Sequence, residues 1–267
     1  METANAVYER SFVPETCQSD PQGRWRIGAV LEAMQITAND HCRALRVWRD
    51  ELGAKGLLWV LFRTDLRLDR YPCVGETVVV RTFTKAGRMK FIPRYFTFTD
   101  ARGERFGAAG SLWMMIDRRT RASVSPAGCG FALPDAAEIE APIRIGMGEK
   151  PIAGRTDART YAPQYTDLDA NGHVGNIRYI DWLCNHLGPE RMARCEIADL
   201  SVVYRQEVRC GDPLVHTLTL ADGGEFGFDG SVGDRQVFGI RGRLRAREPE
   251  PGTACCDDCP EKGGYAK

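Results

Sequence analysis

Three polar residues, spaced two apart, stand directly before a helix-like apolar pattern. Asp169, Asn171 and His173 occupy alternate positions of the stretch DLDANGHV, in a chain with only four histidines. This spacing cannot place all three side chains on one helical face, so we expect them to line an extended or turning segment at the start of the helix. His173 could act as acid or base near neutral pH, Asn171 could orient a water or polarise a carbonyl, and Asp169 could fix the imidazole or bond backbone amides.

Backbone amides at the start of a helix favour developing negative charge, so the N–H groups of Gly172 to Val174 could hold an oxyanion. Asp, Asn and Gly are also ordinary capping residues, and residue types alone leave capping open as an explanation. A rival set, Asn39-Asp40-His41, lies inside an earlier helical stretch. It is more simply explained as a polar helical face with a hydrogen-bonded histidine.

The elements that would position these residues occur twice along the chain. Residues 27–52 carry apolar side chains at helical spacing and are followed by alternating, strand-like segments as far as residue 120. The same order returns with a strand at 160–167, a helical stripe that ends at Gly188-Pro189, and strand-like runs as far as residue 247. The landmarks Gly75 and Gly211 are separated by 211 − 75 = 136 residues.

This duplicated order predicts an α+β fold, a tandem (double) hotdog, in which one curved antiparallel sheet wraps around two helices. We expect an N-terminal hotdog over residues 1–125, a linker over 126–158, a C-terminal hotdog over 159–248 and a disordered tail over 249–267. The polar set belongs to one half only. Shifting Asp169, Asn171, His173 and Glu207 back by 136 gives Ala33, Gln35, Thr37 and Tyr71.

Composition narrows the class of partner. The chain has 36 basic and 36 acidic residues, so no global field argues for nucleic acid or an anionic membrane. No apolar run of about 18 residues could span a bilayer, and the N-terminus has no secretory apolar region or plastid-type leader. Ten cysteines are mostly scattered, and the C-x-x-C pair of Cys256 and Cys259 lacks further zinc ligands. We therefore expect a reduced, cytoplasmic protein without a metal site.

Four motifs, taken together and in order, resemble the acyl-acyl carrier protein thioesterases of plants and bacteria over about residues 8–247. DLDANGHVGNIRYIDW resembles the family's Asp-x-Asn-x-His-Val-x-Asn-x-x-Tyr motif, and VVYRQEV resembles its Tyr-Arg-Arg-Glu strand. LDRYPCVGETVVV resembles its Asp-Arg-Tyr-Pro turn, and SLWMMIDRRTRASVS its Val-Trp-Val-Met-Met segment. Any one of these matches would be weak alone.

The resemblance implies a double hotdog that hydrolyses the thioester between a fatty acyl chain and the phosphopantetheine arm of acyl carrier protein, with no cofactor. By motif position the catalytic set carries over to Asp169, Asn171, His173 and Glu207. The family often has a cysteine after this glutamate, whereas this chain has Val208. A cysteine nucleophile at that position is thereby excluded, which favours Glu207 as general base on water.

Strict alternation raises a conflict at this glutamate. It places Glu207 on one strand face with Arg205 and Arg209, which is a very polar face for one that should meet an acyl pocket. A bulge or the end of the strand could turn it, and a plain surface salt-bridge network is the alternative.

The resemblance also implies an acyl pocket and a docking surface for the acidic carrier. For the pocket we expect apolar residues of the first half, among them Met34 and Trp59. For the carrier we expect the basic hairpin residues Lys85, Arg88, Lys90 and Arg94; Arg178, Arg191 and Arg194 form a second candidate patch. An acyl-CoA thioesterase, a non-catalytic acyl-binding hotdog and, more weakly, a dehydratase stay open, as do chain length and a monomeric or homodimeric state.

Overall fold

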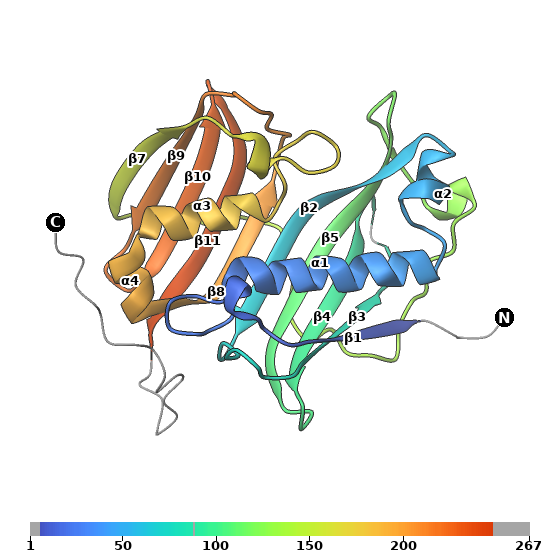
Figure 1. Ribbon diagram of the computed structural model, residues 1–267. Coiled ribbons are helices and arrows are strands. Elements are labelled where there is room, and N and C mark those ends of the chain that lie inside the picture. Colours follow the sequence, from blue (N-terminus) through green and yellow to red (C-terminus); the bar gives the residue numbers. More distant parts are fainter. Residues whose placement is uncertain (1–5, 88, 248–267) are drawn as a thin grey trace.

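A single antiparallel sheet of eleven strands carries both long helices on one of its faces (Figure 1). The computed structural model describes residues 6–87 and 89–247. The first half contains β1 (Val7–Phe12), η1 (Thr16–Gln18), α1 (Ile27–Ala44), α2 (Arg49–Gly53), β2 (Leu57–Leu68), β3 (Val78–Thr84), β4 (Ile92–Asp100), β5 (Arg105–Asp117), β6 (Ser123–Val124) and η2 (Ala127–Cys129). The second half contains β7 (Arg155–Tyr161), η3 (Tyr165–Asp167), α3 (Arg178–Leu187), α4 (Pro189–Arg194), β8 (Cys195–Tyr204), β9 (Leu214–Leu220), β10 (Glu225–Val232) and β11 (Arg235–Ala246).

The strand order shows the duplication directly. It runs β1-β3-β4-β5-β2-β8-β11-β10-β9-β7, so the second half repeats the order of the first in the reverse direction across the sheet. The strands β3 and β9 begin at Val78 and Leu214, and 214 − 78 = 136, the offset expected from the sequence. The predicted tandem hotdog, a curved antiparallel sheet around two helices, is confirmed.

The two half-sheets are joined where β2 pairs with β8, a contact that we call the seam. The pairing runs from Arg63 opposite Val203 to Arg67 opposite Asp199 and includes Leu66 opposite Leu200. Beyond Arg63 the strand β2 continues to Leu57 alongside β5 alone, while β8 ends at Tyr204. The seam therefore opens at this end.

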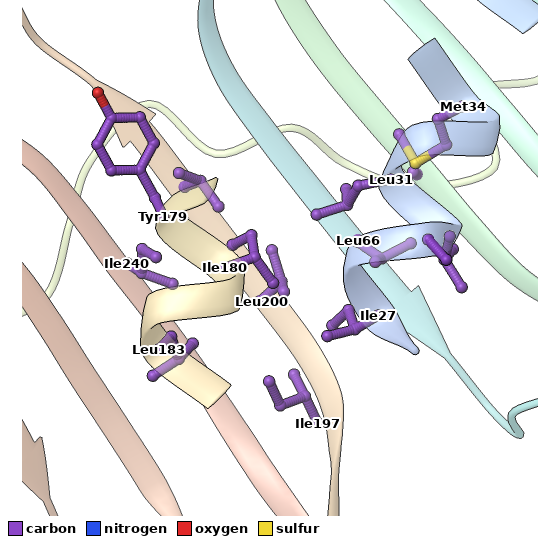
Figure 2. Packing of buried hydrophobic residues seen from close by; sticks show 14 of the residues in the cluster. Ile27, Leu31, Met34, Leu66, Tyr179, Ile180, Leu183, Ile197, Leu200 and Ile240 are labelled. Atoms are coloured by element: carbon purple, nitrogen blue, oxygen red, sulfur yellow. The ribbon is translucent and has the colours of Figure 1, made fainter. Parts of the chain in front are cut away.

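The helices α1 and α3 bury their apolar stripes against the helix-side face of the sheet, within one core cluster. Figure 2 shows Ile27, Leu31 and Met34 of α1 near Leu66, with Ile180 and Leu183 of α3 near Leu200 and Ile240. The spacing of these residues at three or four positions is what puts them on one helical face. Gly28 lies at the contact of α1 with α3: a Cβ there would lie 2.6 Å from Oδ1 of Asp181, so that carboxylate would have to move.

The segment between the halves crosses the opposite face of the sheet. Gly146 donates its N–H to Oδ2 of Asp65 at 2.7 Å, and Nη1 of Arg63 donates to the carbonyl of Gly148 at 3.1 Å. A Cβ on Gly110 would lie 2.6 Å from Cγ1 of Ile145, so glycine is what lets the segment lie flat on β5. Farther along, Nε of Arg241 in β11 donates to the carbonyl of Lys150 at 3.1 Å, so the connection contacts strands on both sides of the seam.

Two expected elements differ from the structure. The strand expected over 160–167 is β7, which ends at Tyr161, and Tyr165–Asp167 forms a 3-10 turn instead. The helix begins at Arg178, which leaves Val174 and Ile177 in the preceding loop although they fit the helical stripe. The expected tail over 249–267, with Cys256 and Cys259, lies outside the described residues. No helix in the described ranges is long and apolar enough to cross a membrane.

Removing a buried side chain within the seam should destabilise the whole protein. Leu200 is 3% exposed, and we expect Leu200→Ala to lower the free energy of unfolding by about 3 kcal/mol through lost burial and the cavity left behind. Urea unfolding followed by tryptophan fluorescence measures the change. Val215→Ala, at a position 37% exposed on β9, is the control and should change it by less than about 1 kcal/mol. Equal effects at the two positions would contradict a core that runs through the seam.

Candidate active site

A buried aspartate anchors the loop that leads into α3. Asp167 accepts hydrogen bonds from the Tyr161 hydroxyl at 2.6 Å, the Gln164 N–H at 2.8 Å and Nε1 of Trp182 at 3.3 Å. Three donors satisfy most of its lone pairs, which is what makes a carboxylate stable at 7% exposure. Sequence reasoning did not single out Asp167. The signal was available in its position three residues after Gln164, where it completes a capping box.

The next aspartate shapes the loop itself. Oδ1 of Asp169 accepts from the N–H groups of Asn171 at 2.7 Å and His173 at 3.3 Å, and its Oδ2 accepts from Nδ2 of Asn171 at 3.2 Å. The Asp169 N–H donates to the His173 carbonyl at 2.7 Å, and Gly172 makes the turn at φ +76°, which a glycine adopts most easily. Asp169 therefore orients His173 through its backbone, while no bond to the imidazole is seen.

Across the open end of the seam, an imidazole, a carboxylate and a guanidinium come together. Nε2 of His173 lies 3.3 Å from Oε2 of Glu207, and Nη2 of Arg121 lies 2.5 Å from Oε1 of the same carboxylate. The His173 and Glu207 side chains are 26% and 38% exposed, so both are reachable by water. With a carboxylate on Nε2, that nitrogen carries the proton and Nδ1 is the acceptor when the ring is neutral.

Backbone contacts hold the two sides of this cluster in place. Val174 donates its N–H to the carbonyl of Val208 at 2.8 Å, which ties the loop to the segment after β8. Because β8 ends at Tyr204, Glu207 is no longer bound by strand alternation. The conflict raised by the sequence is thus resolved by the end of the strand. Arg121 comes from the turn between β5 and β6 in the first half, and sequence reasoning did not identify it.

The amides expected to hold an oxyanion are already in use. The N–H of Gly172 donates to the carbonyl of Asp169, that of His173 to Asp169 Oδ1, and that of Val174 to Val208. The assignment of an oxyanion site to the Gly172 and Val174 amides is therefore wrong, because this loop needs them for its own closure. The N–H groups of Asn176 and Ile177, closer to α3, donate to no acceptor among the described residues.

Tyr179 adds a hydroxyl beside the two carboxylates. Burial raises the pKa of its phenol well above the usual range, and the charges of Asp169 and Glu207 raise it further. Figure 2 shows its hydroxyl directed away from the aliphatic side chains of the core. The phenol therefore stays protonated at neutral pH and can donate a hydrogen bond. Tyr179 is the last residue of the Asp-x-Asn-x-His-Val-x-Asn-x-x-Tyr motif, and the sequence alone gives it no specific role.

Two hollows lie on the helix side of the sheet. An apolar pocket of about 60 Å³ lies under the C-terminal part of α1. Its lining is Ala38, Asn39, Cys42, Trp48, Trp59, Thr84, Ile92, Arg94, Trp113 and Leu133. A groove of about 810 Å³ runs between the start of α1 and the helices α3 and α4, but it is lined by many charged side chains such as Arg26, Asp181 and Glu196.

The walls of the smaller hollow carry few charges, so they suit apolar groups better than the walls of the larger groove do. Trp59 lines this pocket, and its Nε1 donates to the carbonyl of Val47 at 3.1 Å. A contact of Trp59 with substrate stays a prediction. Met34 instead lies in the core cluster, 4% exposed, and does not line this pocket.

The basic hairpin expected to meet the carrier is largely committed to other contacts. Arg94 is 5% exposed and points inward, which makes its assignment as a surface contact wrong. Nζ of Lys85 donates to the carbonyls of Ala136 and Ala137, and the exposed Lys90 lies over the ring of Phe91. Arg88 lies outside the described residues. In the second candidate patch Arg178 pairs with Asp181 at 2.9 Å.

The rival set in α1 has structural contacts. Asp40 pairs with Arg10 and Arg43, and His41 is fully buried with its Nδ1 2.9 Å from Nη1 of Arg94. These contacts agree with the polar-face explanation. Within the described ranges no group of three or more His, Cys, Asp or Glu side chains is placed to hold a metal, and the described cysteines are free thiols.

The duplicated fold, with its one-sided polar cluster at the open seam, defines a tandem hotdog protein with a hydrolase-like site. Comparison with known families gives the identification. The family model for the acyl-ACP thioesterase N-terminal domain matches residues 5–126, and that for the acyl-ACP thioesterase C-terminal domain matches residues 152–237. The chain belongs to the acyl-ACP thioesterase family.

Individual relatives agree with this family. A dodecanoyl-[acyl-carrier-protein] hydrolase of Cinnamomum camphora is 27% identical over 82% of this chain and 60% of its own length. An acyl-[acyl-carrier-protein] hydrolase of Cuphea viscosissima is 28% identical over 75% of this chain and 51% of its own. The chain thus spans about half to three fifths of the length of these curated relatives.

Solved structures show the same fold. An acyl-ACP thioesterase from Bacteroides thetaiotaomicron superimposes with a TM-score of 0.75 at 27% identity, over 92% of this chain and 100% of that one. The 12:0-ACP thioesterase from Umbellularia californica gives a TM-score of 0.76 with the same coverage, at 23% identity.

If Asp169 shapes the loop, removing its carboxylate should loosen the amides that it binds. We expect Asp169→Ala to speed hydrogen exchange at the Asn171 and His173 amides about fivefold, the size of effect that a lost capping bond gives. Asp169→Asn keeps an accepting oxygen and should have a smaller effect. Asp222→Ala, in an exposed turn, is the control. Unchanged exchange at both amides in Asp169→Ala would contradict the role.

Proposed function

We propose that this protein hydrolyses the thioester of a fatty acyl chain borne by acyl carrier protein and releases the free fatty acid. The observation that carries the proposal is the contact of Glu207 with His173 at the open end of the seam, in a chain of the acyl-ACP thioesterase family. The activity is a proposal for this chain because it spans only part of the length of its curated relatives.

The two carboxylates of the site have different tasks. Asp169 binds donors of its own loop through both oxygens, whereas Glu207 contacts the side chains of His173 and Arg121 and, at 38% exposure, is open to water. Glu207 is therefore the group that takes a proton from water as the water oxygen attacks the thioester carbonyl. When the C–S bond of the tetrahedral intermediate breaks, the proton passes from Glu207 or His173 to the departing thiolate. The products are a carboxylic acid and a free thiol.

The charge that develops on the carbonyl oxygen needs donors of its own. The amides of Asn176 and Ile177 are free of protein acceptors in the described chain, and they lie at the positive end of the α3 dipole. We assign them this role in place of Gly172 and Val174. Asn171 is exposed and keeps one side-chain N–H free, with which it can position the water.

A covalent route through cysteine has no support at this site. The residue after Glu207 is the fully buried Val208, and Cys210 lies on the exposed surface beyond it. Direct attack by water needs only the groups already named. The first half contributes the acyl pocket, and it also contributes Arg121, so the site belongs to both halves.

An acidic carrier would find a basic rim around Glu207. Arg118, Arg119 and Arg121 follow β5, and Arg205 and Arg209 flank Glu207; all five are exposed. Arg121 already pairs with Glu207, and Arg205 pairs with Glu149. We propose that the carrier docks on this rim, which replaces the hairpin of Lys85 to Arg94 as its contact surface. Docking there would place the end of the phosphopantetheine arm at the seam.

Removing the proposed base, or the imidazole that contacts it, should lower turnover strongly without unfolding the protein. We expect Glu207→Gln and His173→Ala each to lower kcat by about 100-fold or more, the usual contribution of a positioned acid or base. A thiol-release assay on carrier-bound and CoA-bound chains of varied length measures this and also tests the acyl-CoA alternative. Glu225→Gln, exposed on β10, is the control. Wild-type turnover in both site variants would refute the catalytic assignment and favour a non-catalytic acyl-binding protein.

Reversing a charge on the rim should weaken the binding of carrier-bound substrates and leave the binding of small thioesters unchanged. We expect Arg119→Glu to raise KM for acyl-acyl carrier protein about tenfold at low salt, with the effect shrinking as salt screens it. Hydrolysis of a short acyl-pantetheine thioester should stay unaffected. Arg105→Glu, at the other end of β5, is the matched control. An equal rise in KM for both variants would show that the rim is not the docking surface.

A further inference from the structure

The loop before α1 repeats the hydrogen bonds of the loop before α3. Oδ1 of Asp20 accepts from the N–H groups of Gln22 at 2.9 Å and Arg24 at 3.0 Å, and the Asp20 N–H donates to the Arg24 carbonyl at 2.8 Å. Gly23 donates to the Asp20 carbonyl at 2.9 Å and turns at φ +74°. The loop of Asp169 makes the same four bonds at positions numbered 149 higher (169 − 20 = 149). The fold therefore holds two copies of this loop, one at the start of each long helix.

The copy before α1 has lost the imidazole. Arg24 stands at the position of His173 (173 − 24 = 149). Its Nη1 lies 2.9 Å from Oε2 of Glu196, which is 5% exposed and belongs to β8 of the other half. A guanidinium stays protonated in proteins and has no acceptor atom. The copy therefore has no general base at this position.

The copy has also lost the carboxylate. The Trp25 N–H donates to the carbonyl of Pro72 at 2.8 Å, which corresponds to the bond from Val174 to Val208. The two acceptors are 136 residues apart (208 − 72 = 136), so Tyr71 stands where the other site has its glutamate. Its hydroxyl donates to a backbone carbonyl of β8 at 2.8 Å, and burial raises the pKa of the phenol well above its usual range. Tyr71 therefore cannot take a proton from water at neutral pH.

The larger groove, of about 810 Å³, runs along this copy. One wall comes from the loop and the start of α1 and includes Asp20, Gln22 and Trp25; the other comes from the end of α3, from α4 and from the start of β8. Its volume lies within the range of about 300–1,000 Å³ that small-molecule sites occupy. Charged and apolar side chains alternate in its walls, as Arg26 and Ile27 do. Such walls suit a ligand that has both amide groups and an aliphatic part.

A donor in the wall of the groove has no acceptor. Trp25 is 1% exposed, and its Nε1 makes no hydrogen bond with any described residue. By contrast, Nε1 of Trp59, Trp113 and Trp182 each donates to a protein oxygen. A buried donor without a partner costs free energy, so such atoms usually have one. A carbonyl oxygen of a ligand in the groove can supply the acceptor after a small rotation of the indole ring.

We propose that this groove is a second binding site for the pantetheine arm of an acyl thioester, which it holds without hydrolysing it. The copied loop presents the same backbone as the loop before α3, and the amide and thioester carbonyls of the arm are acceptors for Nε1 of Trp25. Arg24 and Tyr71 provide no base, so the C–S bond stays intact. The class of ligand rests on the proposed function, because it is taken from the thioester expected at Glu207.

Counting the bound ligands tests the groove. The probe is an acyl-pantetheine in which an amide replaces the thioester, titrated by calorimetry over several chain lengths. We expect two molecules per chain in the wild type. Ala193→Trp and Asn185→Trp, each at an exposed position in the wall of the groove, should each leave one. Glu190→Trp, exposed on α4 but outside the lining, is the matched control and should leave two.

The outcomes separate this inference from the proposed function. Equal numbers of bound probe in the wild type and in both groove variants would overturn the inference and leave the proposed function standing. One molecule in the wild type and none in the groove variants would support the groove site. That second result would contradict the proposed function instead, because the probe would then avoid Glu207.

The indole of Trp25 gives the second readout. In protein with ¹⁵N-labelled tryptophan, Trp25→Phe identifies the N–H signal of this residue. We expect the signal to move downfield when the probe binds to the wild type and to stay in place in Ala193→Trp. Pantetheine alone should move it at a concentration at least tenfold higher, and a fatty acid alone should not. A fatty acid that moves the signal as the full probe does, or a probe that binds without moving it, would contradict a site for the pantetheine arm.

Discussion

The pairing of β2 with β8 is the constraint on which the rest of the molecule depends. It joins two similar half-sheets into one, and it stops at Arg63 and Val203 while β2 runs on. Because β8 ends close by, at Tyr204, the chain after it is released from strand alternation and Glu207 can turn toward the loop before α3. The proposed catalytic cluster lies where the sheet stops being continuous, and both halves contribute to it, since Arg121 comes from one and His173 from the other.

Much of this architecture could be predicted from the sequence, because apolar periodicity and the repeat at 136 residues report directly on which faces are buried. The pair His173 and Glu207 could also be predicted, since it rests on motifs that keep their order along the chain. Strand alternation also predicts the burial of a residue that we expected to be exposed. In the strand IPRYFTF, Arg94 shares its face with Phe96 and Phe98, which are 2% and 0% exposed, so its burial could be predicted from the alternation.

Other features could not be read from one sequence. Whether an amide in a loop is free depends on which acceptor lies opposite it. The hydrogen bonds from Gly172 to Asp169 and from Val174 to Val208 therefore follow from the tertiary structure. The same holds for Arg121, whose partner is 86 residues away. Arg94 gives a further example. Its face of β4 follows from alternation, but its contacts with His41, Thr82 and Cys42 depend on how α1 and β3 lie beside it.

The most direct measurement is a crystal structure of the protein with an acyl-pantetheine analogue in which an amide replaces the thioester. We expect the amide carbonyl beside Glu207 and His173, with an ordered water between the carbonyl carbon and the carboxylate, and the acyl chain passing Trp59 into the pocket below α1. An analogue seated in the larger groove between α1 and α4, with Glu207 and His173 untouched, would contradict the account.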